Sequence, residues 1–419
     1  MKKEIWILNH YATDMFFDEG GRHYWLGKEL IKKGYKITIF CANTIHKSDK
    51  IVSIKKGMLR CAKKDGLQFV FVKTKMYQGN GLSRVKNMLA YTLNMLRLYR
   101  KYGRKYGKPD IIYASSVHPF ALYAGLKIAM YYNIKLISEI RDLWPLTLIA
   151  FGRLKKDSIL ARMMFWYEKK IYERTDELIF TMEGGKNYIQ DQKWDVGHNG
   201  MIDLKKVHHI NNGLILNDYY DYRRKFQIND SDLENNNIFK IVYTGSIGEA
   251  NRLDLIINVA KCLQKKKLPI RFYIWGNGDE KIRLQKRIKQ EKVDNVVFKG
   301  HVEKKYIPYI TSVSDLNILT LKNCNIYQYG LSLNKMFEYI ASQKPFLVVG
   351  AKCKCRILEE NPLCFMLGTS NIQKITEIIV DIYSQNKLKT EISGIDFRTL
   401  YKVCDYSKRA EDLIRIIEG

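Results

Sequence analysis

Short apolar segments alternate with longer amphipathic segments along the whole chain. The apolar segments have strand length and are rich in Val, Ile, Phe and Tyr; they occupy residues 4–9, 36–42, 67–72, 110–115, 134–140, 176–182 and 206–210, and then 239–246, 270–276, 295–300, 315–321, 345–350 and 364–368. Continuous apolar runs of this kind are typical of parallel strands buried on both faces. The pattern therefore predicts an α/β fold of βαβ units, with helices covering both faces of parallel sheets.

The two series of strands are separated by a polar stretch. Residues 217–237, "NDYYDYRRKFQINDSDLENNN", lose apolar periodicity and fill with Asn, Asp and charged residues. We therefore predict a Rossmann-like domain over residues 1–215, a linker over 216–237 and a second Rossmann-like domain over 238–400. Residues 401–419 are expected to form a helix that packs back on the first domain. Two facing doubly wound sheets bind ligands in a cleft at their strand ends.

The charge of the chain is strongly positive. The sequence has 71 Lys and Arg against 43 Asp and Glu, a formal net charge of +28. Such a field attracts polyanions, so nucleic acid, an anionic membrane surface and phosphorylated small molecules are all candidate partners. Composition alone does not choose among them.

Part of this charge is concentrated in residues 81–108, "GLSRVKNMLAYTLNMLRLYRKYGRKYGK", which contain no acidic residue. Met88, Leu89, Met95, Leu96 and Tyr99 fall on one face of the predicted helix. A basic amphipathic helix of this kind suits an anionic membrane surface. The alternative is a helix packed on the core, with a solvated basic face.

Cysteine usage favours a reducing compartment. Eight cysteines are scattered without CxxC pairs or a zinc-type His/Cys cluster. The N-terminus "MKKEIWILNHY" is too briefly apolar for a signal peptide, and no uncharged apolar run reaches the roughly 18 residues needed to span a bilayer. We expect a cytoplasmic protein that, if it meets a membrane, lies on the inner face.

Glycine-rich turns follow three of the predicted strands. They contain Gly20 and Gly21 after the first strand, Gly245, Ser246 and Gly248 with Arg252 nearby after residues 239–244, and Gly276, Asn277 and Gly278 after residues 270–275. Glycine allows the backbone to approach a ligand closely, and the following helix start offers free N–H groups to phosphate. The turn with Gly20 and Gly21 lacks the GxGxxG spacing of a dinucleotide fingerprint, and each of the three turns also fits an ordinary strand-to-helix turn.

The segment "GLSLNKMFEYIASQKP" places Ser332, Asn334 and Lys335 at a predicted helix start, with Glu338 in its first turn. Orphan amides and a lysine at a helix start suit phosphate oxygens. Glu338 has a structural alternative, because a carboxylate there complements the helix dipole. The set of donors and one carboxylate also fits the diphosphate and ribose of a sugar nucleotide.

In the first half, polar residues end two apolar strands. Glu139, Arg141 and Asp142 occur in "SEIRDLWPLTL", and His118 follows "YASSV". Polar groups at a strand end are costly to bury unless they are paired or used at a site. An Arg–Asp structural pair and a structural histidine remain the alternatives.

These segments together resemble a known family. The Gly20 and Gly21 loop, "EIRDLWP", "HHINNGLILNDYY", "YTGSIGEANRLD", "WGNGDEKIRL", "NVVFKGHV" and "GLSLNKMFEYIASQKPFLV" occur in the family's order over nearly the whole chain. In these segments the chain resembles retaining glycosyltransferases of the GT-B class, in the family-four branch that builds O-antigen and capsular polysaccharides.

The resemblance implies roles for individual residues. Donor-binding roles fall on Gly245, Ser246, Arg252, Gly276, Asn277, Gly278, His301, Val302, Ser332, Asn334, Lys335 and Glu338, with Glu338 on the ribose. Acceptor-binding roles fall on Gly20, Gly21, His118 and Glu139. Lys335, Arg141 and Asp142 are the catalytic candidates.

The chain also departs from the family pattern. Gly330 stands where the family has a first glutamate, so the amides of "GLSLNK" would take over its contacts to the donor sugar. Ser246 and Asn251 stand where an arginine and a lysine typically hold the diphosphate, which leaves the charge to Lys335 and Arg252. Arg141 stands where many relatives have a histidine.

The expected reaction is retaining transfer of a sugar, from a UDP-linked N-acetylated or deoxy sugar to a polyprenyl-diphosphate-linked saccharide. No metal, cofactor or nucleic acid is expected to take part. A basic nucleic-acid-binding protein and a sugar-nucleotide epimerase on the same two-domain plan are the alternatives.

Overall fold

The computed structural model describes residues 3–45, 50–77, 79, 81–116, 118–387 and 394–419. The chain divides into two compact units. The N-terminal unit comprises Met1–Asn211 and Tyr406–Gly419, and the C-terminal unit comprises Asn212–Asp405. Within the described residues, no helix is both long and apolar enough to cross a membrane.

The N-terminal unit is built on an eight-stranded sheet of order β3-β4-β2-β1-β5-β6-β7-β8. Its strands are β1 (Glu4–Leu8), β2 (Lys36–Ala42), β3 (Leu59–Lys64), β4 (Leu67–Val72), β5 (Ile111–Ser116), β6 (Lys135–Ile140), β7 (Glu177–Phe180) and β8 (Val207–His209). All neighbours are parallel except β3, which pairs antiparallel with β4. The chain reverses its direction across the sheet between β1 and β5, which makes this pair the topological switch point.

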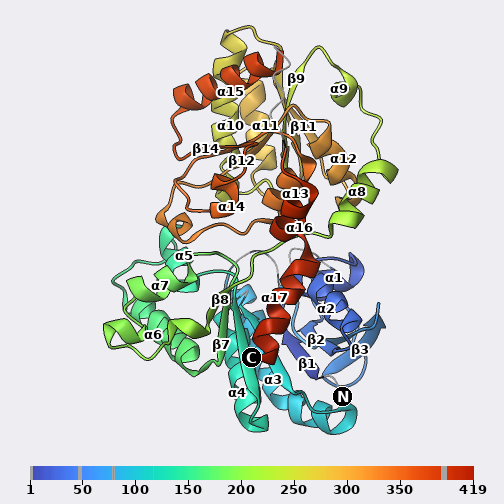
Figure 1. The fold of residues 1–419 in the computed structure, drawn as a ribbon, viewed down its shortest axis with the longest axis vertical. Helices are drawn as coiled ribbons and strands as arrows, with labels where there is room; N and C mark the ends of the chain where they lie inside the picture. The colour runs from blue at the N-terminus through green and yellow to red at the C-terminus, as the bar shows by residue number, and fades with distance from the viewer. Residues whose placement is uncertain (1–2, 46–49, 78, 80, 117, 388–393) are drawn as a thin grey trace. The chain divides into compact units, whose positions relative to one another are not determined.

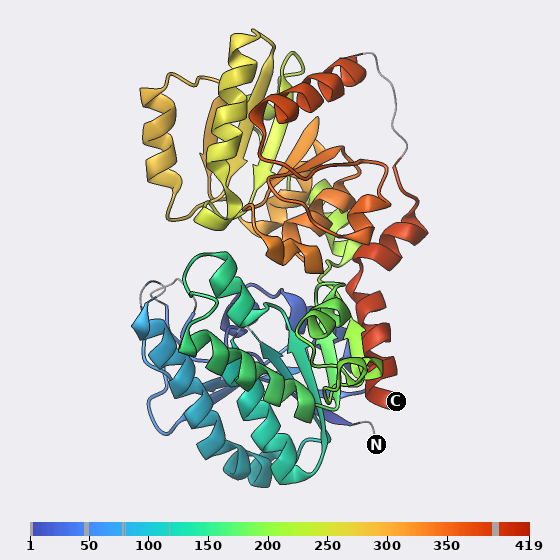
Figure 2. The same ribbon diagram turned by 90° about the vertical axis from the view of Figure 1, so that its left-hand side faces the viewer.

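Helices cover both faces of this sheet. They are α1 (Thr13–Phe17), α2 (Arg22–Lys32), α3 (Leu82–Tyr106), α4 (Pro119–Tyr132), α5 (Trp144–Ala150), α6 (Ile159–Arg174), α7 (Gly185–Asp191) and α17 (Tyr406–Glu418). Helix α4 packs between α3 and α6, and Figure 2 shows these three helices side by side. Helix α17, formed by the end of the chain, packs along α2 (Figure 1).

The C-terminal unit contains a six-stranded, fully parallel sheet of order β11-β10-β9-β12-β13-β14. Its strands are β9 (Phe239–Thr244), β10 (Ile270–Trp275), β11 (Val296–Gly300), β12 (Leu316–Thr320), β13 (Phe346–Val349) and β14 (Cys364–Leu367). The order is that of a doubly wound nucleotide-binding sheet, with its switch point between β9 and β12. The parallel α/β architecture expected from the sequence is confirmed in both units.

The helices of the C-terminal unit are α8 (Leu216–Lys225), α9 (Ser231–Glu234), α10 (Leu253–Lys265), α11 (Lys281–Gln290), α12 (Ile307–Ser312), α13 (Asn334–Ser342), α14 (Arg356–Glu359), α15 (Ile372–Lys387) and α16 (Phe397–Cys404). Helices α10 and α15 pack on one face of the sheet, while α13 and α16 pack on the other. The 3₁₀ turn η3 (Glu249–Asn251) precedes α10.

The polar stretch expected to be a linker contains α8 and α9. Leu216, Tyr219 and Leu233 in it are buried, and the Tyr219 hydroxyl lies 2.9 Å from the Thr311 hydroxyl. The Tyr219 hydroxyl also donates to the Glu338 carbonyl at 3.2 Å. Few of its residues face the core, so the apolar period is too sparse to be recognised in the sequence.

Helix α3 differs from its expected orientation. Met88, Met95 and Tyr99, assigned to a membrane-facing side, are buried against the core of the N-terminal unit. This is the core-packed arrangement that we gave as the alternative for these residues. An apolar face predicted from periodicity alone does not distinguish a protein core from a lipid surface.

Candidate active site

The glycine turns at the ends of β9, β10 and β11 lie together at the carboxyl edge of the C-terminal sheet. Gly245, after β9, donates its N–H to the Trp275 carbonyl at 2.9 Å. The N–H of Ile247 donates to the Asn277 carbonyl at 2.8 Å, and that of Gly276 to the Gly300 carbonyl at 2.7 Å. The turns after β9 and β10 therefore form one hydrogen-bonded layer beside the switch point, where doubly wound sheets bind ligands.

Lys335 reaches this layer from the first turn of α13. Its Nζ donates to the Tyr243 hydroxyl at 2.7 Å and to Asn251 Oδ1 at 3.1 Å, and it lies 4.3 Å from the centre of the Tyr243 ring. Burial lowers the pKa of Lys335 to about 7, although the charge of Glu338 acts in the opposite direction. Both hydrogen-bond acceptors are neutral, so the amine has no direct ion pair among the described residues, and an arriving anion would favour its charged form.

The loop after β9 is arranged around the same lysine. The Ser246 carbonyl accepts hydrogen bonds from the Tyr243 hydroxyl at 2.8 Å and from Asn251 Nδ2 at 2.9 Å. Asn251 Nδ2 also donates to Ser246 Oγ at 3.0 Å. Asn251 thus connects Ser246 to Lys335, and it takes the place where the family pattern has a charged group. Arg252 caps α10 with a left-handed backbone, φ 44°.

Glu338 lies one turn beyond Lys335 on α13. Burial raises its pKa, and the charges of Lys304 and Lys335 oppose this shift. The carboxylate is half-buried. It stands near two cations without a direct ion pair to either among the described residues, which leaves its oxygens open to hydroxyl donors such as those of a ribose.

The other predicted donor residues are spread around this edge. Ser332 is held by Asn212, because its hydroxyl accepts from the Asn212 N–H at 2.8 Å and its carbonyl accepts from Nδ2 at 2.6 Å. Asn334 is exposed at the first position of α13. After β11, His301 is exposed and Val302 packs against the cluster around Tyr273.

In the N-terminal unit, Glu139 is the second-last residue of β6 and lies in a fully buried polar cluster. Its Oε2 accepts from Arg22 Nε at 2.6 Å, and its Oε1 lies 3.1 Å from His23 Nε2 and 2.8 Å from Ser115 Oγ. Tyr113 also donates to this carboxylate. Although burial acts to raise it, the charges of Arg22 and His23 hold the pKa of Glu139 well below its usual range. Glu139 is thus engaged by protein partners.

His118 is the residue before α4 and is fully buried beside His10. Its Nε2 lies 2.6 Å from His10 Nδ1, and burial together with His10 lowers its pKa well below the usual value. It is therefore neutral at pH 7. The cluster continues through Asn9, whose Nδ2 lies 2.8 Å from His23 Nδ1.

Arg141 and Asp142 follow β6 at the same edge. The Arg141 N–H donates to Ser116 Oγ at 3.3 Å; its side chain is half-buried, whereas Asp142 is exposed. In the part of the chain that the structure describes, the two side chains form no ion pair, so the structural Arg–Asp alternative is not observed. Gly20 and Gly21 directly precede α2, and Gly21 has a left-handed φ of 102°.

Sequence reasoning missed several residues of these clusters. Arg22, His10 and His23 were not singled out, nor was Tyr243, which accepts from Lys335. A signal was present for Arg22 and His23, which share the inward face of α2 with Leu26 and Leu30. Charged residues in an apolar helical stripe indicate a buried polar network.

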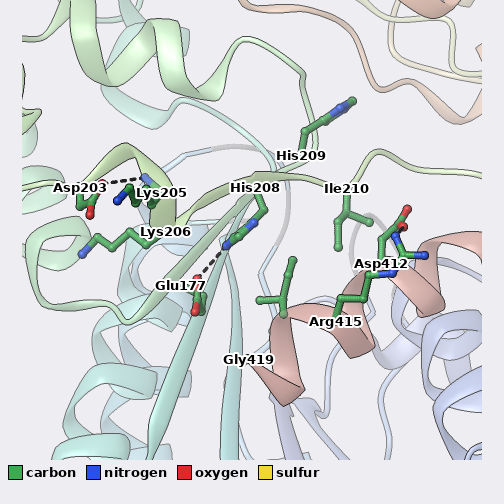
Figure 3. Close-up of a pocket in the computed structure, with 11 residues that line it drawn as sticks. Glu177, Asp203, Lys205, Lys206, His208, His209, Ile210, Asp412, Arg415 and Gly419 are labelled. Carbon is green, nitrogen blue, oxygen red and sulfur yellow. Dashed lines mark hydrogen bonds and ion pairs between the residues drawn. The ribbon is translucent and has the colours of Figure 1, made fainter.

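A separate surface cavity of about 580 Å³ lies between β8 and α17. It contains none of the predicted site residues. Figure 3 shows His208 paired with Glu177 at 2.7 Å on one wall, and Asp412 and Arg415 of α17 on the other. Lys206, also in its wall, donates to the backbone carbonyls of Tyr172 and Thr175. The Glu177–His208 pair thus joins β7 to β8, while Asp412 and Arg415 lie 3.4 Å apart within α17.

Gly276 offers a test of the glycine layer. A Cβ at this position would lie 1.8 Å from the Gly245 carbonyl oxygen, with φ at 151°. We expect Gly276→Ala to destabilise the C-terminal unit by about 1–3 kcal/mol, because both backbone strain and a clash must be relieved. Urea unfolding measures this cost.

Gly248→Ala is the matched control in the neighbouring turn. Gly248 has φ −130°, and a Cβ there would meet nothing within 4 Å. Its replacement is expected to change the free energy of unfolding by less than about 0.5 kcal/mol. Equal costs for the two variants would contradict the close approach of the two turns.

Comparison with known proteins agrees with this architecture. Residues 24–216 match the family model "Glycosyltransferase Family 4", and residues 224–393 match "Glycosyl transferases group 1". Among the described residues, no group of three or more His, Cys, Asp or Glu side chains is placed to hold a metal ion.

Solved structures with the same fold cover the whole chain. They include sucrose-phosphate synthase from Thermosynechococcus elongatus, with TM-score 0.72, 13% identity and coverage of 100% of this chain and 98% of that one. Anabaena HepE in complex with UDP and glucose has TM-score 0.66, 13% identity and full coverage of both chains (100% and 100%). An α,α-trehalose-phosphate synthase (UDP-forming) from Burkholderia vietnamiensis has TM-score 0.69, 12% identity and coverage of 100% and 99%.

The search of curated proteins found no match. The two family models nevertheless account for nearly the whole chain, and each matches one half of it with a parallel sheet of its own. The chain is therefore a glycosyltransferase with the two-domain GT-B fold.

Proposed function

We propose that this glycosyltransferase moves a sugar from a UDP-linked donor to a polyprenyl-diphosphate-linked saccharide, with retention at the anomeric carbon. The part of this proposal that concerns the donor rests on the position of Lys335. Its half-buried amine is held by Tyr243 and Asn251 beside the glycine turns. HepE, a protein of the same fold, has been crystallised with UDP and with UDP-glucose.

The donor would lie along the carboxyl edge of the C-terminal sheet. The N–H of Ser246, in the turn that begins at Gly245, and the ammonium of Lys335 would hold the diphosphate, with Arg252 adding charge. Glu338 would accept hydrogen bonds from the ribose. Gly276 and Gly278 leave room for the base, and Ser332 and Asn334 would lie toward the donor sugar.

The acceptor would bind to the N-terminal unit near Gly20, Gly21 and His118. In the reaction the anomeric C–O bond to the diphosphate breaks, and a new C–O bond forms on the same face of the sugar. The acceptor hydroxyl loses its proton to an oxygen of the departing diphosphate. Lys335 would stabilise the negative charge that develops on that group, and Arg141 and Asp142 would orient the acceptor. The lipid part of the acceptor implies work at a membrane surface, for which residues 81–108 supply basic charge.

The test compares binding with turnover. UDP and UDP-sugars are expected to raise the melting temperature more than ADP or GDP at equal concentration, because ligands that bind the native state stabilise it. Free UDP should then appear only when a polyprenyl-diphosphate saccharide is added. Stabilisation by no nucleotide would overturn the proposal, and conversion of the UDP-sugar without acceptor would indicate an epimerase.

A further inference from the structure

Helix α6 presents an apolar stripe on its outward side. Ile159, Leu160, Met163 and Trp166 recur at helical spacing, and their side chains are between 58% and 77% exposed. The opposite side of the helix, with Ala161, Ile171 and Tyr172, is buried in the unit. An apolar stripe of this size costs free energy in water and indicates a surface that is covered in use.

Helix α3 carries a second outward stripe in the same helical layer. Leu82, Val85, Leu89 and Leu93 are exposed, and they lie on a different side of α3 from the buried Met88 and Met95. Because α4 packs between α3 and α6, the two stripes lie on helices that cover the same face of the sheet (Figure 2). We call the eight residues of the two stripes the α3–α6 face.

Both stripes lie in the first half of their helix. Helices α3, α4 and α6 each connect parallel strands, so their N-terminal ends are at the carboxyl edge of the sheet. The loops that contain His118 and Arg141 leave the sheet at the same edge. The α3–α6 face therefore begins on the side of the N-terminal unit where an acceptor is expected.

The surroundings of the α3–α6 face are basic. Arg153, Lys155, Lys156 and Arg162 are exposed around the start of α6, where Asp157 is the one exposed acidic residue between 151 and 167. On α3, Lys86, Arg97 and Lys101 are exposed, and the helix contains no acidic residue. Apolar side chains surrounded by lysine and arginine match a bilayer with anionic headgroups, where the apolar groups enter the acyl boundary.

We propose that the α3–α6 face binds the surface of an anionic lipid bilayer, with Trp166 and Met163 inserted between the lipids. This inference rests on the proposed function, because binding to a membrane would bring the enzyme to a lipid-linked acceptor. A second copy of the chain is disfavoured as the occupant, since two faces of like charge would oppose each other.

The experiment measures flotation of the full chain with vesicles that contain no acceptor. We expect binding to phosphatidylcholine vesicles with 30% phosphatidylglycerol, and binding at least about tenfold weaker to pure phosphatidylcholine. The triple variant Ile159→Ser, Met163→Ser, Trp166→Ser should lose binding to the anionic vesicles by about tenfold or more. Its melting temperature should stay unchanged, because the three side chains are exposed.

Ile282→Ser is the matched control, since Ile282 is an exposed isoleucine on α11 of the C-terminal unit, 69% accessible. It should float like the wild type. In addition, Trp166→Phe should retain binding but lose the part of the vesicle-induced blue shift in tryptophan emission that Trp166 contributes. Equal flotation of the wild type and the triple variant, or no flotation of either, would overturn the proposal.

Two further outcomes count against it. A dimer in sedimentation velocity that the triple variant abolishes would assign the face to a second copy, and a tight complex with RNA without vesicle binding would assign the charge to nucleic acid. Stabilisation by UDP is measured in parallel without lipid. A wild-type protein that is stabilised by UDP but does not bind anionic vesicles rejects the membrane face alone, whereas a wild-type protein that UDP does not stabilise rejects the proposed function.

Discussion

Replacing Lys335 by alanine is expected to lower kcat by about 10²–10³-fold while the fold stays intact. The ammonium group is the cation that reaches the glycine layer from α13, and it would meet the diphosphate where negative charge grows in the transition state. Its present partners, Tyr243 and Asn251, are neutral and do not lose an ion pair when it is removed. Initial rates of UDP release measure the loss, and circular dichroism checks the fold.

The matched control is Lys374→Ala, a lysine on the exposed side of α15. It removes one positive charge from the same unit and should leave kcat within about twofold of the wild type. Unchanged turnover in Lys335→Ala would remove this lysine from the mechanism. An equal loss of kcat in both variants would indicate that the net charge of the unit matters and not the position of the Lys335 ammonium group.

The pH dependence of UDP binding separates the charge of Lys335 from its bulk. Burial lowers its pKa to about 7 in the free protein, and a bound diphosphate would raise it again. Below pH 7 the amine is already charged, so binding takes up no proton. Above pH 7 binding must protonate it, and the dissociation constant is expected to rise by up to about tenfold per pH unit. Lys335→Met should lose this dependence in titration calorimetry.

Much of the architecture could be predicted because each buried parallel strand has a recognisable apolar pattern in a few neighbouring residues. Each strand of the C-terminal sheet is a short and mostly apolar segment with helical segments before and after it, so β9 to β13 can be recognised in the sequence. The antiparallel edge strand β3 was not predicted. Its sequence, "LRCAKK", is only partly buried and lacks the apolar run.

Only those parts of the candidate site that are formed by residues close together in the sequence could be predicted. Glycine turns and a lysine at a helix start are visible in a few neighbouring residues, and Gly245, Gly276 and Lys335 do meet at one edge. The partners of these residues are not local. Lys335 contacts Tyr243 across 92 positions, and Glu139 contacts Arg22 across 117. No periodicity records such a pairing, because it is fixed by the order of strands in the sheet.

The Arg22–Glu139 pair is expected to give the largest effect on stability. Arg22→Met should destabilise the N-terminal unit by about 3–5 kcal/mol, because it leaves a buried carboxylate without its main cation. It also removes the donors at 2.6 Å and 2.8 Å from the Asn211 and Ile210 carbonyls, where the chain leaves this unit. Urea unfolding of the full chain measures the loss.

A second ion pair on the same helix provides the control for this prediction. Lys32 and Glu29 of α2 also lie 2.6 Å apart, but the lysine side chain is 65% exposed. Lys32→Met should therefore cost less than about 1 kcal/mol, because water replaces the partner. The folded-state pKa of Glu139 lies below its unfolded value, so its stabilisation is present above about pH 4.5 and is lost as the pH falls through the folded-state pKa. Equal costs for the two variants at pH 7 would show that the Glu139 carboxylate is stabilised in some other way, since both ion pairs have the same length and a cation on α2 but only the first is buried.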